Sequence, residues 1–356
     1  MKVAHLSDVH LGFGAETGER GRAADVIRAF ETALNRIAEL EPHVVVVAGD
    51  LFDRPGVTAA PIAAFSRAAA RFHGRLPNVP ILVAAGSRDT PLDVDRPGPL
   101  AVIGALPGVE VAVVRPKRVV VAGGAGSVVL LPHRAVIGSR RPQIAPEPEA
   151  RWNVLVTYAR TSPQSAHALP VDLRGWDYVA LGSVHEHHVV RPRACYSGSL
   201  ERVGPDPWSE AALEKGFVVA DTDTGGINFW PTRARAVVSL APVEATGGGL
   251  PTVARRLSEA LAGVPGGVDG KLIRIPIRGL SPDDLATLDR ELIEPVRRRA
   301  ALVRVEALPG QGASHAREGS GSRSELDDEQ ELRSLLGRAR RLVEDGARPD
   351  RRMLGS

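Results

Sequence analysis

The feature that most constrains the fold is a series of short apolar runs, each followed at once by polar residues. Residues 44–48 form a continuous β-branched run, which is typical of a strand buried on both faces. Similar runs occupy 2–6 and 80–85, and helical periodicity separates the runs at 25–39 and 61–72. This alternation of strands and helices predicts an α/β core with helices packed on the faces of a sheet.

The pattern becomes strand-rich after residue 109. Residues 109–131 contain valine-rich runs separated by Gly and Pro, which predicts consecutive strands and hairpins. Residues 154–158 and 178–181 are expected to be further core strands. A hairpin is predicted for 216–220 and 227–230, across a turn rich in Asp and Gly. Together with the alternating first part, these strands make up a domain that we assign to residues 1–235.

A second, smaller domain is predicted at 236–308. Helical patterns at 252–261 and 282–299 alternate there with strand patterns at 272–277 and 301–305. This order predicts a small α/β domain.

The end of the chain has a different character. Residues 309–323 are rich in Gly, Ser and Ala and are expected to form a flexible linker. Residues 324–356 contain an amphipathic helical pattern with leucines near one face. An isolated helix of this kind is only marginally stable in water, so we expect it to dock on its own chain or on a partner.

Composition limits the cellular setting and the kinds of site. The 356 residues have a net charge of +3 and an apolar fraction of 43%, which is enough for a large core. Cys195 is the only cysteine, which excludes an internal disulfide and a thiolate metal cluster. The sequence lacks a signal-peptide pattern and an apolar run long enough for a membrane span, so we expect a cytoplasmic protein without a membrane partner. The basic residues are nearly all arginine, which suits phosphate binding but also reflects an Ala-, Gly- and Pro-rich composition.

Four polar segments lie where predicted strands end. In open α/β sheets, ligands gather at the carboxyl ends of the strands. Carboxylate and imidazole donors together suit Mn, Fe or Zn. Taken singly, each segment is more typical of a turn or a surface pair, but their common placement indicates one site. The segments are Asp8-Val9-His10, Gly49-Asp50-Leu51-Phe52-Asp53, Gly86-Ser87-Arg88-Asp89 and Gly182-Ser183-Val184-His185.

These segments make the chain similar to the calcineurin-like metallophosphoesterases. The motif series of that family runs D-x-H, G-D-x-x-D, G-N-H-D, an isolated His, and G-H-x-H. The wording D-V-H-L-G and G-D-L-F-D resembles the SbcD type of DNA double-strand-break repair nuclease subunit, as do the segments 196–199 and 214–217. The resemblance implies a layered β-sandwich core flanked by helices, with a small α/β capping domain after it.

The resemblance also implies a metal site of which only one half is complete. One ion would be held by Asp8, His10, Asp50 and His185, all of which match the family pattern. The second ion would share Asp50, but its other ligands are replaced. The replaced positions are Ser87, Tyr158 and Ser183. Hydroxyls are poor ligands beside imidazole, so we expect one well-held divalent ion, with Mn favoured and Fe or Zn also suitable.

The catalytic histidine of G-N-H-D is replaced by Arg88. Arginine stays charged at any working pH and cannot serve as a general acid. Two interpretations stay open. The guanidinium replaces the charge of the missing ion, by pairing with Asp50 or Asp89 or by gripping a phosphate, or it is a solvated side chain at a disused site.

These features lead to a functional prediction with an alternative. The first hypothesis is an SbcD-like exonuclease that hydrolyses DNA phosphodiesters with one ion. The resemblance implies that it would work with an SbcC-type coiled-coil ATPase bound through residues 324–356, and it allows a homodimer. The alternative is a catalytically inactive scaffold that binds DNA, the ATPase, or both. A third, weaker hypothesis is a one-metal phosphoesterase for a small substrate.

Overall fold

The computed structural model describes residues 1–309, except 16–20, 92, 94–97, 140–141, 163–164, 166, 170 and 246–248. These residues fall into two compact units. The larger unit contains Met1–Asp206 and Ala212–Ala234, and the smaller contains Pro207–Ala211 and the described residues from Arg235 onward. The predicted terminal helix, 324–356, and the predicted linker beyond residue 309 lie outside the described residues. In the described part of the chain, none of the helices combines the length and the apolar character that crossing a membrane requires.

The first sheet of the larger unit has six strands in the order β12-β11-β1-β2-β3-β4. Strands β1 to β4 are parallel to one another, whereas β11 pairs antiparallel with both β1 and β12. The carboxyl ends of β1, β2 and β3 therefore lie at the same edge. The strands are β1 (Lys2–Leu6), β2 (Val44–Ala48), β3 (Ile81–Ala84), β4 (Val109–Ala112), β11 (Gly216–Asp221) and β12 (Ile227–Pro231).

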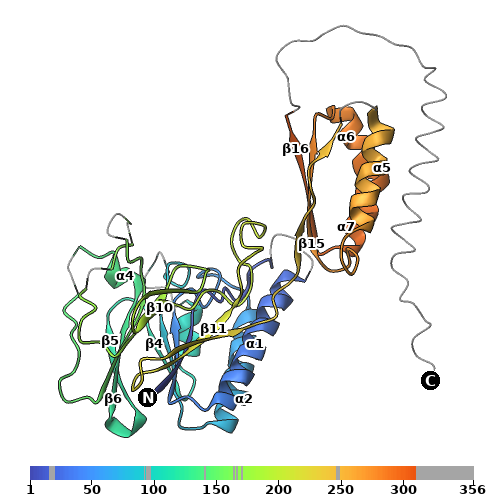
Figure 1. Ribbon diagram of the computed structural model, residues 1–356. Helices are drawn as coiled ribbons and strands as arrows, with labels where there is room; N and C mark the ends of the chain where they lie inside the picture. Colours follow the sequence, from blue (N-terminus) through green and yellow to red (C-terminus); the bar gives the residue numbers. More distant parts are fainter. Residues whose placement is uncertain are drawn as a thin grey trace, which may run out of the picture. The chain divides into compact units, whose positions relative to one another are not determined.

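Three helices pack on one face of this sheet: α1 (Arg22–Leu40), α2 (Ala59–Arg75) and α3 (Pro99–Ile103). Figure 1 shows α1 and α2 side by side along this face. Strand β2 is buried on both sides, because alternate side chains point to opposite faces. Val45 and Val47 join the helix-covered core, and Val44 and Val46 join a second core on the other face.

A second six-stranded sheet covers that other face, in the order β5-β6-β7-β8-β10-β9. Apolar side chains of both sheets share one core, in which Val3 and Val46 meet Val128 and Val156. The predicted layered β-sandwich is therefore confirmed. Its strands are β5 (Lys117–Val121), β6 (Gly126–Leu131), β7 (Trp152–Tyr158), β8 (Tyr178–Gly182), β9 (His188–Arg191) and β10 (Ala194–Tyr196), with the short helices η1 (Ala122–Gly124) and α4 (His133–Val136) between them.

The smaller unit is a parallel sheet with helices on one face (Figure 1). The chain is helical over the whole of the predicted range 282–299, with a π-helical turn at Asp289–Ile293 between two α-helical parts. Pro295 has no N–H to donate within the helix, and the π-helical turn before it accommodates this gap in the regular hydrogen-bond series. The elements are β13 (Val237–Ser239), β14 (Val243–Glu244), α5 (Gly249–Ala262), β15 (Leu272–Arg278), α6 (Pro282–Leu288), α7 (Glu294–Arg299) and β16 (Leu302–Leu308).

Candidate metal centre

The loops after β1 and β2 run side by side at the carboxyl edge of the first sheet. The backbone N–H of Asp8 donates to the carbonyl oxygen of Gly49 at 3.0 Å. The N–H of His10 donates to the carbonyl oxygen of Asp50, also at 3.0 Å. These hydrogen bonds extend the strand pairing beyond the strands themselves, so they place Asp8, His10 and Asp50 next to one another.

Two glycines bring the ends of the second sheet against these loops. A Cβ on Gly49, where φ is +90°, would lie 2.4 Å from the Tyr158 ring. A Cβ on Gly182 would lie 1.7 Å from the carbonyl oxygen of Ala48. Both distances are too short for any side chain, so glycine is needed at each position for β7 and β8 to reach the site.

Four of the predicted site residues have left-handed backbone conformations. The φ angles are 50° at Asp8, 54° at His10, 48° at Asp50 and 96° at Ser183. Such conformations of non-glycine residues cost of order 1–3 kcal/mol each and cluster at functional sites. The rest of the fold therefore holds these residues in place against a local preference.

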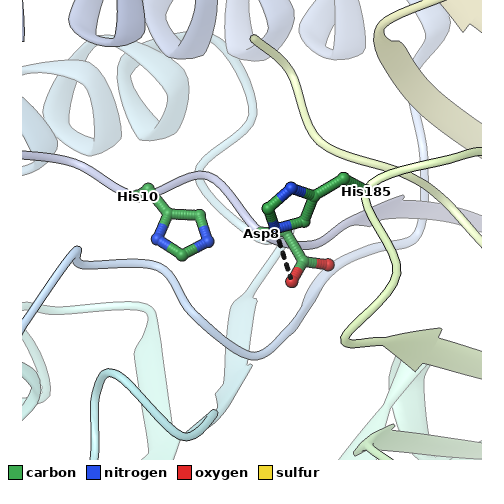
Figure 2. Close-up of side chains that lie close together, drawn as sticks. All are labelled: Asp8, His10 and His185. Atoms are coloured by element: carbon green, nitrogen blue, oxygen red, sulfur yellow. Dashed lines mark ion pairs between the residues drawn. The ribbon is translucent and has the colours of Figure 1, made fainter. Parts of the chain in front are cut away.

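Ligand atoms from Asp8, His10 and His185 converge at the candidate site. Oδ1 of Asp8 and Nε2 of His10 are buried, and neither has a hydrogen-bond partner among the described residues. Nε2 of His185 lies 3.9 Å from Oδ1 of Asp8. Figure 2 shows the three side chains facing a common point, and their ligand atoms all lie within 4.8 Å of one another. A buried polar atom without a partner is costly, and a cation among these atoms would remove that cost.

Asp50, the fourth predicted ligand, lies next to His10. Its Oδ2 lies 3.9 Å from Nε2 of His10. Burial raises the pKa of Asp50 to about 7, although the neighbouring His10 lowers it and the nearby carboxylates of Asp89 and Asp8 raise it. The oxygen and nitrogen donors of these four residues match the preferences of Mn, Fe and Zn, so this half of the site fits a divalent ion.

Asp53 orients His10, a role that the sequence did not predict. Its Oδ1 lies 3.2 Å from Nδ1 of His10. An ionised carboxylate only accepts hydrogen bonds, so Nδ1 carries the proton and Nε2 keeps its lone pair for an ion. Burial lowers the pKa of His10, but the Asp53 hydrogen bond and the surrounding carboxylates outweigh it and raise the pKa overall. The sequence did offer a signal for this role, because Asp53 is the second aspartate of the G-D-x-x-D motif.

Replacing Asp53 with Ala is expected to weaken Mn²⁺ binding roughly 10–100-fold, the usual effect of losing a partner of a ligating histidine. The Nε2 lone pair of His10 would no longer be fixed toward the ion. Isothermal titration of the metal-free protein with Mn²⁺ measures the effect. Asp53→Asn is the matched control, because its amide oxygen can still accept from Nδ1. Equal affinities for Asp53→Ala and the wild type would contradict the orienting role.

Asp89 is a second residue whose role the sequence did not predict. Its side chain is fully buried, and its two oxygens accept hydrogen bonds from three backbone N–H groups. The donors are Leu51 at 3.0 Å, Phe52 at 2.8 Å and Gly86 at 3.1 Å. Burial raises the pKa of Asp89, and these donors act in the opposite direction. Asp89 therefore ties the loop after β3 to the loop that carries Asp50.

At the position predicted for a second ion, hydroxyl groups hydrogen-bond to one another and to Asp50. The Ser87 hydroxyl lies 3.3 Å from Oδ2 of Asp50 and 3.1 Å from the Tyr158 hydroxyl oxygen. Burial raises the pKa of Tyr158, so its hydroxyl stays neutral at any working pH. In contrast to Asp8 and His10, these groups are engaged with one another. The arrangement offers little to a second cation.

The two arginines near this half differ in how they are held. Arg88 donates its backbone N–H to Oδ1 of Asp50 at 2.7 Å, but its side chain is exposed. In the described residues its guanidinium forms no ion pair with Asp50 or Asp89, so the predicted pairing does not occur in this structure. Arg160, which no sequence signal marked, donates from Nε to the Ser183 hydroxyl at 3.0 Å.

Comparisons with known proteins agree with this geometry. The sequence model of the calcineurin-like phosphoesterase family matches residues 1–186, which include every residue of the candidate site. The DNA double-strand break repair protein Mre11 of Methanocaldococcus jannaschii is 26% identical over 246 residues, or 62% of each chain. Mre11 of Methanopyrus kandleri is 27% identical over 64% of this chain and 55% of its own. Mre11 of Aeropyrum pernix is 35% identical over 25% of this chain and 21% of its own. The matches therefore span less than two thirds of these relatives.

Proposed function

Because this chain belongs to the calcineurin-like phosphoesterase family, we propose that it is a metal-dependent phosphodiesterase that acts on DNA. The observation that carries the proposal is the convergence of unsatisfied ligand atoms from Asp8 and His10 with His185. The DNA substrate is supported by the names of the relatives, which are DNA double-strand break repair proteins. Within the family, the wording of the motifs favours an exonuclease of the SbcD type.

We propose that Asp8, His10, Asp50 and His185 hold one divalent ion, with Mn²⁺ as the first candidate. A bound divalent ion supplies charge for a phosphoryl oxygen and lowers the pKa of water. The protein positions the ligands: Asp53 fixes the His10 ring, and the left-handed turns aim the carboxylates. Arg88 replaces the histidine that serves as general acid in the family, and an arginine cannot donate a proton at working pH. The rate of hydrolysis should therefore be lower by a factor of roughly 10²–10⁴ than with a general acid.

Mn²⁺ binding is expected to weaken as the pH falls below 7. Asp50 must be ionised to bind an ion, and its pKa in the metal-free protein is about 7. At pH 6 only about one tenth of the carboxyl is ionised, so the affinity should be roughly tenfold lower than above pH 8. The raised pKa of His10 acts in the same direction. Titrations at pH 6, 7 and 8 measure this effect, and an affinity that does not change with pH would contradict it. Asp50→Asn should bind weakly with a smaller pH dependence.

The proposed partners are DNA and an SbcC-type coiled-coil ATPase. Residues 324–356 are the proposed dock for the ATPase, and a homodimer is a further proposal from the family resemblance. Deleting residues 324–356 is expected to abolish co-purification with the ATPase and to leave the metal site intact. Binding that survives the deletion would show that the dock lies elsewhere.

Metal analysis combined with a nuclease assay tests the proposed activity. Purified protein should contain one tightly held ion and should degrade linear DNA slowly in the presence of Mn²⁺. Asp50→Asn should abolish the cleavage, which rules out a contaminating nuclease. Two tightly held ions would overturn the one-ion proposal.

An inactive scaffold that binds DNA, the ATPase, or both is the second candidate. The closed hydroxyl cluster around Ser87 and Tyr158 and the exposed Arg88 side chain favour it. A single bound ion without cleavage of any DNA substrate would support the scaffold. Cleavage of a small phosphodiester but not of DNA would instead indicate a one-metal phosphoesterase for small substrates.

A further inference from the structure

We propose that Arg160 forms a phosphate-binding subsite next to the metal centre. The inference rests on the proposed function, since the phosphate is taken to be that of the substrate. The Arg160 guanidinium would bind the non-bridging oxygens of the phosphate. It would also supply positive charge, which the neutral hydroxyl groups of Ser87 and Tyr158 cannot. The sequence pointed to Arg88 for this role, but the contacts point to Arg160.

The backbone around Arg160 is fixed before any ligand arrives. Its N–H donates to the carbonyl oxygen of His167 at 2.7 Å, and its own carbonyl accepts from the N–H of Leu169 at 2.8 Å. The Tyr196 hydroxyl bonds the backbone of both chain neighbours of Arg160, at 3.1 and 3.0 Å. Little backbone entropy therefore remains to be lost when the side chain binds an anion.

The side chain of Arg160 is directed toward the centre through Ser183. Nε donates to the Ser183 hydroxyl at 3.0 Å, and the Ser183 N–H donates to Oδ2 of Asp8 at 3.1 Å. A guanidinium has five N–H donors, and this contact uses one. The side chain is exposed, and within the described residues Nη1 and Nη2 bond to no other group. They form the planar pair of donors that matches two phosphate oxygens.

The charge of the site explains why such a subsite is useful. Several carboxylates surround the centre, whereas the proposed ion adds only two positive charges. The carboxylates are those of Asp8, Asp50, Asp53 and Asp89. The negative electrostatic potential of these carboxylates would repel a phosphodiester anion. Arg160 adds positive charge beside the ion without using any of the ligand atoms.

Phosphate binding to the metal-free full-length protein tests the proposal without relying on activity. Binding of inorganic phosphate is followed by ³¹P line broadening after the metal has been removed with EDTA. Arg160→Gln is expected to weaken it roughly tenfold to a hundredfold, the range for a charged hydrogen-bonding pair. Ser183→Ala keeps the charge but removes the orienting acceptor, so a smaller loss is expected. Arg88→Gln tests the competing arginine and is expected to lose less than Arg160→Gln does. Arg174→Gln, at an exposed arginine paired with Asp172, is the matched control and should bind as the wild type does.

The outcomes distinguish a role of Arg160 from one of Arg88, and they test the phosphate subsite separately from the proposed phosphodiesterase activity. Unchanged phosphate affinity in Arg160→Gln would overturn the inference, and so would a loss confined to Arg88→Gln. In Mn²⁺-loaded protein, Arg160→Gln should raise KM for bis(p-nitrophenyl) phosphate more than it lowers kcat, and Arg160→Lys should restore part of the loss. If the protein hydrolyses nothing, the proposed activity fails, but the phosphate titration still decides the role of Arg160. Circular dichroism of each variant checks that it is folded.

Discussion

Replacing Asp8 with Asn is expected to abolish stabilisation of the protein by Mn²⁺. Losing even a partner of a ligand costs roughly 10–100-fold in metal affinity, and losing a ligand itself should cost more. At an Mn²⁺ concentration 100 times its dissociation constant, the wild type should gain about 2.7 kcal/mol in free energy of unfolding. With affinity reduced a hundredfold or more, Asp8→Asn should gain less than about 0.5 kcal/mol at that concentration. Urea unfolding with and without Mn²⁺ measures the difference.

The metal-free Asp8→Asn protein should be at least as stable as the wild type. Asp8 keeps one oxygen bonded to the N–H of Ser183, and its other oxygen is buried without a partner in the part of the chain that the structure describes. An asparagine can keep the first contact and relieves the buried negative charge. Glu186→Gln is the matched control, because Glu186 is an exposed residue next to His185 and its loss removes one charge but no ligand atom. A full Mn²⁺ effect in Asp8→Asn would show that Asp8 is not a ligand.

Replacing Asp89 with Ala is expected to lower the free energy of unfolding of the larger unit by roughly 3–5 kcal/mol. The change would leave the N–H groups of Leu51, Phe52 and Gly86 buried without an acceptor, at about 1–3 kcal/mol for each unsatisfied group. The same loops carry Asp50, so Mn²⁺ affinity should fall as well. Hydrogen exchange of the β2 amides in increasing urea reports on the larger unit alone.

Two variants make the Asp89 result interpretable. Asp89→Asn keeps one oxygen acceptor and should lose less stability than Asp89→Ala. Asp172→Ala removes an exposed aspartate that also accepts a backbone N–H, that of Arg174, and should change stability by less than about 0.5 kcal/mol. A loss of under 1 kcal/mol in Asp89→Ala would mean that water or another acceptor satisfies these N–H groups.

Most of the architecture could be predicted because its elements carry long, regular patterns. The β-branched run 44–48 and the apolar stripe of 25–39 each indicate one structure, and both occur where expected, as β2 and α1. The short strands β9, β10, β13 and β14 were missed, since segments of two to four residues are too short to show a period. The helix at 282–299 also forms, and only its π-helical turn at Asp289–Ile293 was not predicted, because the apolar pattern continues through it.

The sequence by itself determined the family and the placement of Asp8, His10 and Asp50 at adjacent strand ends. That placement follows from parallel strands, whose carboxyl ends meet at one edge. Only the tertiary structure decided which groups support and complete the site. Asp89 binds backbone N–H groups more than 30 residues away in the chain, and Arg160 is held by Ser183 across two strands of the second sheet. Hydrogen-bond partners of this kind depend on how loops that are distant in the sequence pack together. The residues next to Asp89 or Arg160 in the chain therefore do not predict which partners these side chains have.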